Sequence, residues 1–421
     1  MIYNSVDNMS DSISQGDEIG QGATHASRYL WIVGLLVTGA VSSQALLRQG
    51  LPVLYPFIQD EFVLSRAQVG LITSALSIGF VVAVFIAGWL TDTLGVKRML
   101  AISLFSLTAF TLAFPLVCSF SIILALALFI GIASSPLNPA TTRAVIDWFP
   151  GRIRALAMSV KQTGVPLAGA LTAAVLPALT LVVGWRMAAA VTGILILAIA
   201  ISFISLYRNA PRGIQAVHKF NLATIKNILR NRGLVMIFIW SATFIGFQYV
   251  VLTYFMLFLI EELGLSAIMA GGMLAIAQVS SSIARVLWGA ASDFIFHGRR
   301  IVVLAITGFL TVLWMLSASL MGVGVPSAFV YLMAIVIGIS TMSFHGVFLT
   351  LVGEQAEAGQ VGVTLGVPMT VNNLSQTIMP PLFGHLVDIS NSYSLVWKGT
   401  AAFALICTLA LLALGRESQR C

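Results

Sequence analysis

Two stretches of the sequence share one pattern. Residues 88–98 read GWLTDTLGVKR, and residues 289–300 read GAASDFIFHGRR. Each stretch begins with Gly-x-x-x-Asp and continues through a second glycine to a pair of basic residues. The first glycines of the two stretches are 201 residues apart, and so are their aspartates, Asp92 and Asp293. A pattern repeated in this way predicts that the chain is built from two similar halves.

The repeat lies in a very apolar chain. Of its 421 residues, 58% are hydrophobic and 9% are charged, whereas about 25% are charged in a typical soluble domain. The mean hydropathy is +0.98. A soluble fold of this length could not bury so much apolar surface. The composition therefore excludes a soluble enzyme, a disordered chain and a nucleic-acid-binding protein, and it predicts that a lipid bilayer surrounds most of the chain.

Apolar segments follow one another from Tyr29 onward, and each is long enough to cross about 30 Å of hydrocarbon as a helix. We expect an all-α integral membrane protein with twelve transmembrane helices in two pseudo-symmetric six-helix bundles. The predicted spans are 29–58, 66–90, 99–118, 121–143, 155–182, 186–207, 233–260, 267–291, 300–321, 327–351, 360–386 and 394–415.

The segments between and outside the spans complete the predicted organisation. The N-terminal tail is polar and lacks the basic start of a signal peptide, so we expect it to be disordered. The longest connection is basic and joins the two bundles. The predicted parts are a cytoplasmic tail (1–28), an N-terminal bundle (29–207), a cytoplasmic loop (208–232), a C-terminal bundle (233–415) and a second cytoplasmic tail (416–421).

Basic residues are distributed unevenly between the two sides of the predicted bundle. One side holds most of the 22 Lys and Arg residues, whereas the other holds only Arg66, Arg186 and Lys398. Positively charged connections stay in the cytoplasm. We therefore expect both termini to be cytoplasmic and the protein to cross the inner (cytoplasmic) membrane many times. We also expect a monomer.

The pattern at residues 88–98 resembles the loop signature of the major facilitator superfamily, G-x-x-x-D-(R/K)-x-G-x-(R/K)-(R/K). Thr93 stands where that signature has a base, and in the second copy the downstream glycine lies two residues later. The resemblance extends over residues 29–415 and implies two six-helix domains that rock about a site near the bilayer midplane. The resemblance also implies that the two copies of the motif form a gate on the cytoplasmic side. The simpler interpretation is that the residues of the motif only end helices and set the orientation of the chain in the membrane. The residues implied in gating are Gly88, Asp92, Gly95, Lys97, Arg98, Gly289, Asp293, Arg299 and Arg300.

Three cations, Arg48, Lys161 and Arg285, fall inside the predicted spans, whereas no acidic residue lies deep in a span. A charge within the membrane costs roughly 3 kcal/mol or more and usually has a function. Three buried bases without a buried acid need a negative partner. The simplest partner is an anionic substrate.

Arg48 is the first candidate for binding that anion. It lies about 15 Å from the outer end of the first span, at 1.5 Å per residue. Gln44 and Tyr55, at i−4 and i+7, share its helical face. The segment from Arg48 to Phe62 resembles the first span of organic-anion members of the superfamily, in which the arginine binds the substrate carboxylate. The alternative is that Arg48 snorkels outward or caps a carbonyl group.

Arg285 is the second candidate, and Gln278, at i−7, lies on the same polar stripe of its span. The pattern from Arg285 to Asp293 resembles the eighth span of oxalate/formate exchangers and monocarboxylate porters, in which the arginine holds a substrate carboxylate. Domain packing is the alternative role. In the oxalate exchangers a lysine partners this arginine, and Asn372 stands at that position here. This difference argues against a dicarboxylate, and against oxalate itself.

Other polar residues within the spans each have two interpretations. Tyr249, which lies 201 residues after Arg48, either binds substrate or forms hydrogen bonds between helices, and the same holds for Asn372 and Gln376. Lys161 either points inward or reaches the membrane interface. His345 could exchange protons near neutral pH, or it packs in the core.

The sequence therefore predicts a secondary transporter that moves a small organic anion, in the first place a monocarboxylate, by alternating access. Protons are one option for a coupling ion; facilitated diffusion and anion exchange are others. No phosphate-binding loop, zinc motif or nucleophile elbow occurs in the sequence, so we expect neither enzyme activity, nor a cofactor, nor a metal. Efflux of drugs or other apolar or cationic compounds is an alternative that the embedded bases do not favour. A sensor that has kept the fold is a third hypothesis.

Overall fold

The computed structural model describes residues 29–209, 230–355 and 361–415, and within these ranges every regular element is a helix. The first half (residues 29–209) begins with a helix at residues 29–48. It continues with α2 (Leu51–Phe62), α3 (Arg66–Leu94), α4 (Val96–Ala113), η1 (Phe114–Leu116), α5 (Phe120–Ser134), α6 (Leu137–Trp148) and α7 (Gly151–Leu206). The second half (residues 230–355 and 361–415) contains α9 (Arg232–Glu261), α10 (Ala267–Ala290), η2 (Ala291–Ile295), α11 (Arg300–Ser319), α12 (Ser327–Ile339), α13 (His345–Glu354), α14 (Val361–Ser390) and α15 (Tyr393–Leu414).

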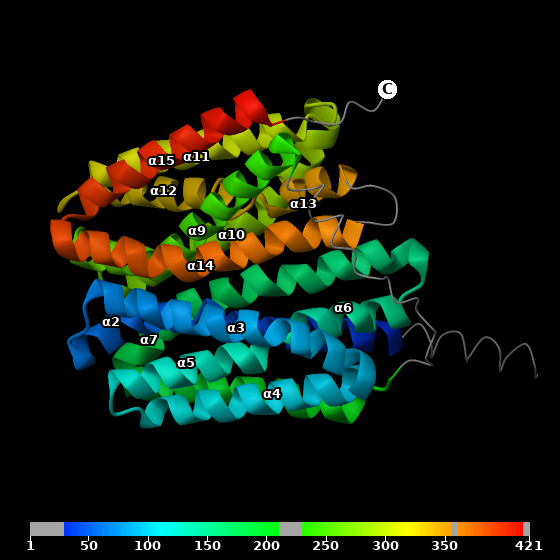
Figure 1. Cartoon of the computed structure of the whole chain (residues 1–421). Helices are drawn as coiled ribbons and strands as arrows, with labels where there is room; N and C mark the ends of the chain where they lie inside the picture. Colours follow the sequence, from blue (N-terminus) through cyan, green and yellow to red (C-terminus); the bar gives the residue numbers. More distant parts are fainter. Residues whose placement is uncertain (1–28, 210–229, 356–360, 416–421) are drawn as a thin grey trace, which may run out of the picture.

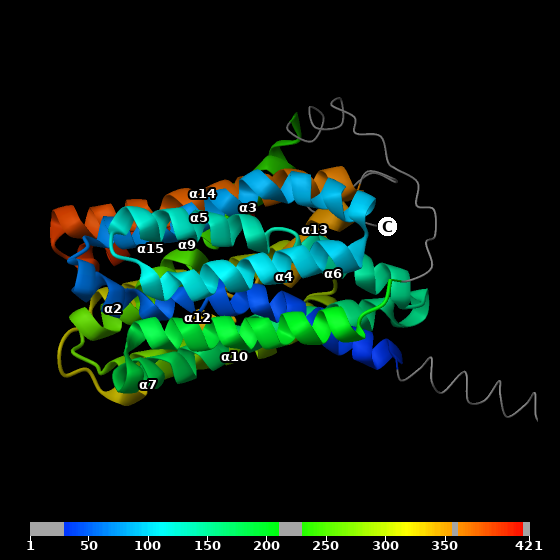
Figure 2. The same ribbon diagram turned by 90° about the horizontal axis from the view of Figure 1, so that it is seen from below.

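The helices of the two halves run roughly along one axis and lie side by side. In Figure 1 the first half, blue to green, lies below the second half, green to red, and Figure 2 views the molecule from below. The connections between helices gather at two ends of the bundle. We call the end on the left of Figure 1, where α3 begins, the Arg66 end. The opposite end, which holds the turn after η2, is the Asp293 end.

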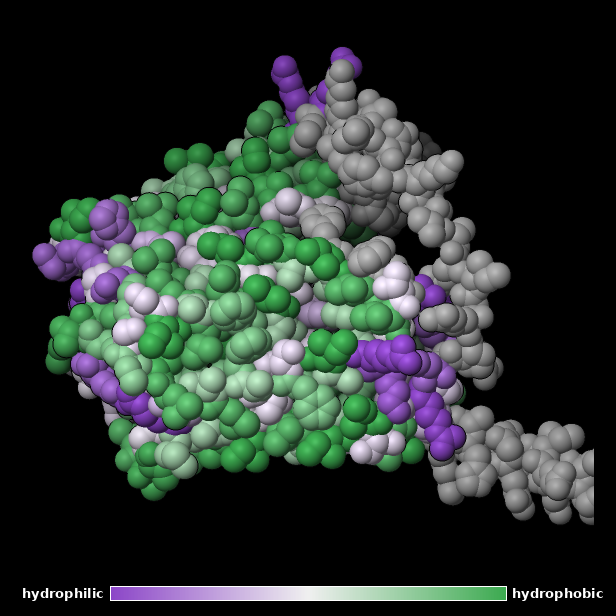
Figure 3. Space-filling model, turned by 60° about the horizontal axis from the view of Figure 1, so that its bottom comes forward, coloured by the Kyte–Doolittle hydropathy of each residue, from purple (hydrophilic) through white to green (hydrophobic). Residues whose placement is uncertain are grey.

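The outer surface is that of a protein surrounded by lipid. Figure 3 shows apolar surface between hydrophilic groups at the two ends of the molecule. Large apolar side chains are exposed, among them Leu35 (73%), Val182 (82%) and Leu395 (60%). In the described part of the chain, nine helical segments are long and apolar enough to cross a membrane. Together these features confirm the predicted class, an all-helical membrane protein.

One pair of predicted spans is joined by a single residue and not by a loop. The predicted spans 155–182 and 186–207 both lie in α7, which is continuous except at Gly184. Gly184 has φ 81° and ψ 157°, a backbone conformation that side chains with a Cβ strongly disfavour. The chain therefore reverses direction at one glycine, without a loop.

One predicted span, 327–351, is interrupted in its middle. α12 ends at Ile339, α13 begins at His345, and residues 340–344 form turns. The hydroxyl groups of Ser340 and Ser343 donate to backbone carbonyl groups one turn earlier, each at 2.6 Å. Such bonds compete with the regular helical pattern. The break leaves backbone groups within the bundle that other side chains must satisfy.

The two halves pack mainly through two helix pairs, α3 with α14 and α7 with α10. Glycines allow the close approach. A Cβ added at Gly384 of α14 would collide with the backbone of Arg66, and one added at Gly271 of α10 would collide with the carbonyl oxygen of Ala173. Small residues at helix contacts are the usual means of close packing in membranes. Two adjacent residues of the first half, Arg48 and Gln49, contact α14 and α10 respectively.

Candidate functional site

Arg48 lies where the first apolar span is interrupted. Residues 49–50 form a turn between the first helix and α2, near the middle of the segment Tyr29–Phe62. Pro52 has no backbone N–H group, so the carbonyl group of Arg48 loses the donor that a regular helix would supply. The N–H group of Val53 donates instead to the carbonyl oxygen of Gly50, at 3.0 Å. The proline and the glycine together place the interruption directly after Arg48.

The side chain of Arg48 joins the two halves. Its Nη2 donates to Oε1 of Gln376 on α14, at 2.9 Å. Its guanidinium carbon lies 4.8 Å from the ring centre of Phe80 on α3 and 5.4 Å from that of Tyr249 on α9. Both distances are within the range in which aromatic rings stabilise a cation. The structure thus brings together the predicted residues Arg48, Tyr249 and Gln376, whereas Phe80 carried no sequence signal that distinguishes it from other apolar residues.

Arg48 has no acidic partner among the residues that the structure describes. The ion pairs there join other residues, all near the ends of helices, and the Nε of Arg48 is buried without a hydrogen bond. A buried charge is stable only when it is paired or well hydrogen bonded. With one hydrogen bond and two rings, the guanidinium retains capacity for an anion, which it can bind through two parallel N–H groups.

Two neighbouring asparagines on α14 face different partners. Asn373 accepts a hydrogen bond through Oδ1 from Nε2 of Gln376 and so belongs to the group around Arg48. Asn372 instead accepts a hydrogen bond through Oδ1 from the hydroxyl group of Ser241 on α9, at 2.9 Å. Adjacent residues on a helix point in different directions. Asn372, which the sequence proposed for substrate binding, is thus engaged in a contact between helices.

A second contact between the halves lies beside the first. Nε2 of Gln278 on α10 donates to Oε1 of Gln49, at 2.7 Å. Gln278 is 3% exposed and is one of the predicted residues. Gln49 was missed, because position 49 lies on another face than Arg48 if the helix is taken as regular. Gln44, one turn before Arg48, is buried, and no hydrogen bond of its side chain occurs within the described residues.

Tyr55 lies apart from Arg48 and its partners. Its hydroxyl group forms a hydrogen bond with Thr73 on α3, at 2.9 Å, and Thr73 forms another with Thr253 on α9, at 3.1 Å. The expectation that Tyr55 shares a face with Arg48 assumes a regular helix over both residues. The interruption at residues 49–50 removes that assumption.

Arg285 supports the break between α12 and α13. Its Nη2 donates to the carbonyl oxygen of Met342, at 3.1 Å, and Ser281 donates to the same oxygen, at 2.8 Å. Trp288 donates to the carbonyl oxygen of Ile339, at 2.6 Å. Three side chains of α10 therefore satisfy carbonyl groups at the break. This contact agrees with the packing alternative for Arg285, although its Nε is buried without a partner in the described structure.

His345 is the first residue of α13. Its ring stacks on that of Phe344, with ring centres 4.7 Å apart, and its Nδ1 is buried without a hydrogen bond within the described residues. The histidine therefore lies close to the Arg285 contact and outside the group around Arg48.

Lys161 is buried in the first half and has three oxygen partners. Its Nζ donates to Oγ1 of Thr142 at 2.7 Å, to Oδ1 of Asn138 at 3.2 Å and to the carbonyl oxygen of Asn138 at 3.5 Å. The side chain is 2% exposed, so it points inward. Since its three donors are used within the first half, Lys161 links α7 to α6 in this structure.

The first copy of the repeated motif lies between α3 and α4. The side chain of Asp92 is outside the described part of the structure. Gly95 has φ 81° and precedes α4, and the N–H group of Lys97 donates to Oδ1 of Asn209, at 3.0 Å. Arg98 is exposed, and Gly88 has open space where a Cβ would be. The motif thus forms a tight turn that only glycine can begin easily.

The second copy forms an ion cluster within the second half. Nη1 of Arg300 lies 2.5 Å from Oδ1 of Asp293 and 2.8 Å from the hydroxyl group of Ser292, and Nη2 lies 3.1 Å from Oε1 of Glu354. Arg299 is exposed, and Gly289 has free space beside it. η2 is a π-helix, and the turn after it accommodates the two-residue offset of the downstream glycine.

A polar cluster at the Arg66 end also joins the halves and was not predicted. The Arg66 side chain lies 2.7 Å from Oε2 of Glu261 and 3.6 Å from Oδ1 of Asp388. The same Glu261 oxygen accepts a hydrogen bond from Tyr393, at 3.0 Å. Tyr254 donates to the carbonyl oxygen of Arg66, at 2.7 Å. Polar contacts between the halves therefore extend from Arg48 to the Arg66 end.

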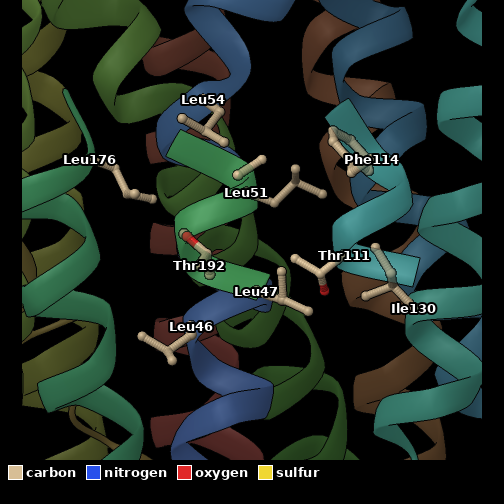
Figure 4. Close-up of a pocket in the computed structure, with 11 residues that line it drawn as sticks. Leu46, Leu47, Leu51, Leu54, Thr111, Phe114, Ile130, Leu176 and Thr192 are labelled. Atoms are coloured by element: carbon tan, nitrogen blue, oxygen red, sulfur yellow. The ribbon is translucent and has the colours of Figure 1, made fainter. Parts of the chain in front are cut away.

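An apolar pocket lies within the first half, away from the charged groups. Figure 4 shows Leu47 and Leu51 on the side of Phe114 and Ile130, and Leu46 and Leu54 line the same pocket. No ionisable residue lines this pocket. It cannot bind an anion through charge, so Arg48 and its partners are the better candidate site. Within the described residues, no three His, Cys, Asp or Glu side chains gather as metal ligands would.

Comparisons with known proteins agree with this architecture. The family model described as Major Facilitator Superfamily matches residues 36–380. A solved bacterial homolog of the human lysosomal transporter Spinster, in an inward-facing and occupied conformation, is similar with a TM-score of 0.75 and 15% identity, over 92% of this chain and 96% of that one. The solved nucleoside transporter NupG is similar with a TM-score of 0.75 and 15% identity, over 91% of this chain and 98% of that one. These structures show the fold alone.

Curated relatives are similar along most of their length. The hexuronate transporter of Bacillus subtilis (strain 168) is 24% identical over 387 residues, which cover 87% of this chain and 90% of that protein. The protein named "Probable galactarate/D-glucarate transporter GarP" of Escherichia coli (strain K12) is 25% identical over 423 residues, covering 91% and 94%. An uncharacterized MFS-type transporter of Mycobacterium tuberculosis is 27% identical over 397 residues, covering 92% and 87%. These relatives are transporters and not enzymes.

Proposed function

The chain belongs to the major facilitator superfamily, and on that premise we propose that it is a secondary transporter of a small organic acid anion. The observation that carries the proposal is Arg48, which lies at the junction of the two halves, between two aromatic rings, with no acidic partner among the described residues. A negative charge supplied by the substrate would complete this site.

The curated relatives support the same class of substrate. The names of two relatives, a hexuronate transporter and a probable galactarate/D-glucarate transporter, refer to acids that carry hydroxyl groups. At about 25% identity the comparison supports an organic acid anion for this chain, and the choice among such acids depends on its own residues.

We further propose that the preferred substrate has one carboxylate group. Only Arg48 among the three embedded cations lies between the halves. Arg285 donates to the carbonyl oxygen of Met342, and Lys161 uses its donors within the first half. Because the described residues supply no second free cation at the site, a second carboxylate group would have to be buried without an ion pair.

Alternating access between two six-helix bundles is the proposed mechanism. The bundles comprise residues 29–207 and 233–415 and are joined by the loop 208–232. They cross the bacterial cytoplasmic membrane twelve times, with the tails 1–28 and 416–421 in the cytoplasm. An anion bound by Arg48 and by residues of α14 at once interacts most strongly when the halves are close together. Such a ligand stabilises the occluded conformation, through which the protein passes between its two open conformations.

For coupling, we propose His345 as the residue to test. Its Nδ1 has no hydrogen-bond partner within the described part of the chain, and it is the only histidine deep in a predicted span. The measurement is anion uptake into proteoliposomes with and without a pH gradient. If His345 carries a proton, His345→Gln loses the stimulation by the gradient and retains exchange of anion against anion.

Flux into proteoliposomes tests the proposed function. We expect the parent protein to exchange glucuronate, and Arg48→Gln to reduce that exchange at least a hundredfold, because the buried carboxylate group would lose its counter-charge. Arg285→Gln is the matched control for removing an embedded arginine, and it should alter the apparent affinity much less. Normal glucuronate exchange by both variants would refute the proposal, as would export of apolar cations without any exchange of organic acids.

A further inference from the structure

The amide groups of Gln49 and Gln278 form a hydrogen-bonded pair between the halves. The bond uses one donor of Gln278 and the acceptor oxygen of Gln49. Nε2 of Gln49 and Oε1 of Gln278 have no other partner within the described residues, and neither is a fully buried atom. The pair therefore retains unused N–H groups on both Nε2 atoms, since each amide nitrogen carries two, and an unused acceptor on Oε1 of Gln278. Exchanging N and O in both amides leaves unused donors and an unused acceptor as well.

The chemistry of this pair selects among ligand groups. A carboxylate group accepts hydrogen bonds but cannot donate one, so it would leave the acceptor oxygen of Gln278 unsatisfied. An ammonium group could donate to that oxygen but would lie beside the positive charge of Arg48. A hydroxyl group both donates and accepts. It is the group that fits the pair best.

The position of the pair relative to Arg48 fixes the kind of molecule. Gln49 follows Arg48 directly, so their Cα atoms are about 3.8 Å apart. Arg48 reaches α14 and Gln49 reaches α10, on two sides of the space between the halves. Gly169 of α7 makes room, because a Cβ there would collide with both glutamine side chains. Because the two side chains extend toward different helices, a molecule whose carboxylate group binds Arg48 needs a carbon chain beyond that group to reach the amide pair.

We infer that the Gln49–Gln278 pair binds a hydroxyl group of the substrate whose carboxylate group is held by Arg48, and that it selects hydroxylated acids over plain ones. This inference rests on the proposed function, and it adds two residues that bind the uncharged part of the substrate. The hydroxyl group accepts a hydrogen bond from Nε2 of Gln49 and donates one to Oε1 of Gln278.

The test uses two acids of equal chain length, gluconate with hydroxyl groups and hexanoate without them. Binding is measured by calorimetry on the purified full chain in lipid nanodiscs. We expect Gln278→Leu to weaken gluconate binding about tenfold, the effect of roughly one to two lost hydrogen bonds, and to leave hexanoate binding unchanged. Gln49→Leu should do the same. Gln59→Leu, about 15 Å further along the same span, is the matched control and should change neither.

The outcomes separate this inference from the proposed function. If the parent binds gluconate through Arg48 and Gln278→Leu binds it equally well, the inference fails and the proposed function stands. An equal loss of both acids in Gln278→Leu also overturns the inference, since that pattern indicates a general disturbance of the site. If the parent binds neither acid, the inference fails, and glucuronate exchange decides the proposed function separately. Selective loss of gluconate supports the inference, and rescue by Gln278→Asn strengthens it.

Discussion

Asp388 of the second half caps the first turn of a helix in the first half, because its carboxylate group accepts the backbone N–H group of Arg66 at 3.1 Å. It also accepts the N–H group of Ala67, at 2.9 Å. These are two of the N–H groups at the start of α3 that have no partner within the helix. A negative charge at this position also interacts favourably with the helix dipole. The cap thus forms only when the halves meet at the Arg66 end.

Removing this cap should open the Arg66 end. We expect Asp388→Ala to raise the population with separated halves about fivefold, since an N-cap contributes about 1 kcal/mol. The measurement is the distance between spin labels at Val63→Cys and Ile268→Cys, two exposed positions at that end, in a background without the native cysteines. Longer distances should become more frequent.

The control for the cap is an ion pair that lies within one half. Arg186 and Glu61 are 2.5 Å apart, and both belong to the first half. Glu61→Gln removes a carboxylate group near the same end without touching a contact between halves, so the label distances should not change. Equal effects of Glu61→Gln and Asp388→Ala would contradict the proposed role of the cap.

Arg48→Lys should transport poorly although it keeps the positive charge. Lysine cannot offer two parallel N–H groups to a carboxylate group, nor can its ammonium group stack flat between Phe80 and Tyr249. We expect the apparent affinity for the anion to fall by at least tenfold, measured as the KM of uptake into proteoliposomes. A KM equal to that of the parent would mean that only the charge of Arg48 matters.

Arg285 and Ser281 should stabilise the protein together, because both donate to the carbonyl oxygen of Met342. Removing Arg285 as Arg285→Gln should cost about 1.5–3 kcal/mol, as for a hydrogen bond that involves a charged group. Removing Ser281 as Ser281→Ala in addition should cost more than the sum of the single changes, since the carbonyl oxygen then has neither donor. Unfolding in denaturant measures the three free energies. Strict additivity would show that the two side chains do not share one acceptor.

Replacing Lys161, unlike replacing Arg285, should change the stability of the protein only slightly. Its partners are oxygens of Asn138 and Thr142, and no acidic group pairs with it in the described structure. Replacing a buried charge by an apolar group of similar size is often neutral, so Lys161→Met should change stability by less than about 1 kcal/mol and leave the KM of anion uptake unchanged. Loss of anion binding in Lys161→Met would instead place Lys161 in contact with the substrate.

The sequence predicts the all-helical membrane class well, because apolar length can be read directly from the residues. Arg48, Tyr249 and Gln376 could be singled out because polar groups are rare within such spans, and the structure brings these three together. Arg285 and Asn372 satisfy the same criterion, yet they serve contacts between helices. A rare polar residue indicates a need for a partner but not which partner it has.

The residues that the sequence did not reveal depend on long-range geometry. Gln49 reaches Gln278 only because α10 of the second half lies beside this part of the first span. Asp388 caps α3 only because α14 packs against that helix at one end. Both relationships join residues more than 200 positions apart, and helical periodicity carries no information on how two distant helices are placed. Likewise, the break between α12 and α13 depends on serine hydroxyl groups that also occur within regular helices.

The interruption after Arg48 has a consequence for how the protein distinguishes molecules. One peptide bond joins the residue that faces α14 to the residue that faces α10, and a peptide bond is rigid. If Arg48 binds the carboxylate group and the Gln49–Gln278 pair binds a hydroxyl group, as proposed, a compound with only one of these groups would engage one of the two helices. Only a compound with both groups at the correct separation would then contact both helices. The junction would then respond only to molecules that carry both a carboxylate group and a hydroxyl group, because both groups must bind before the halves close.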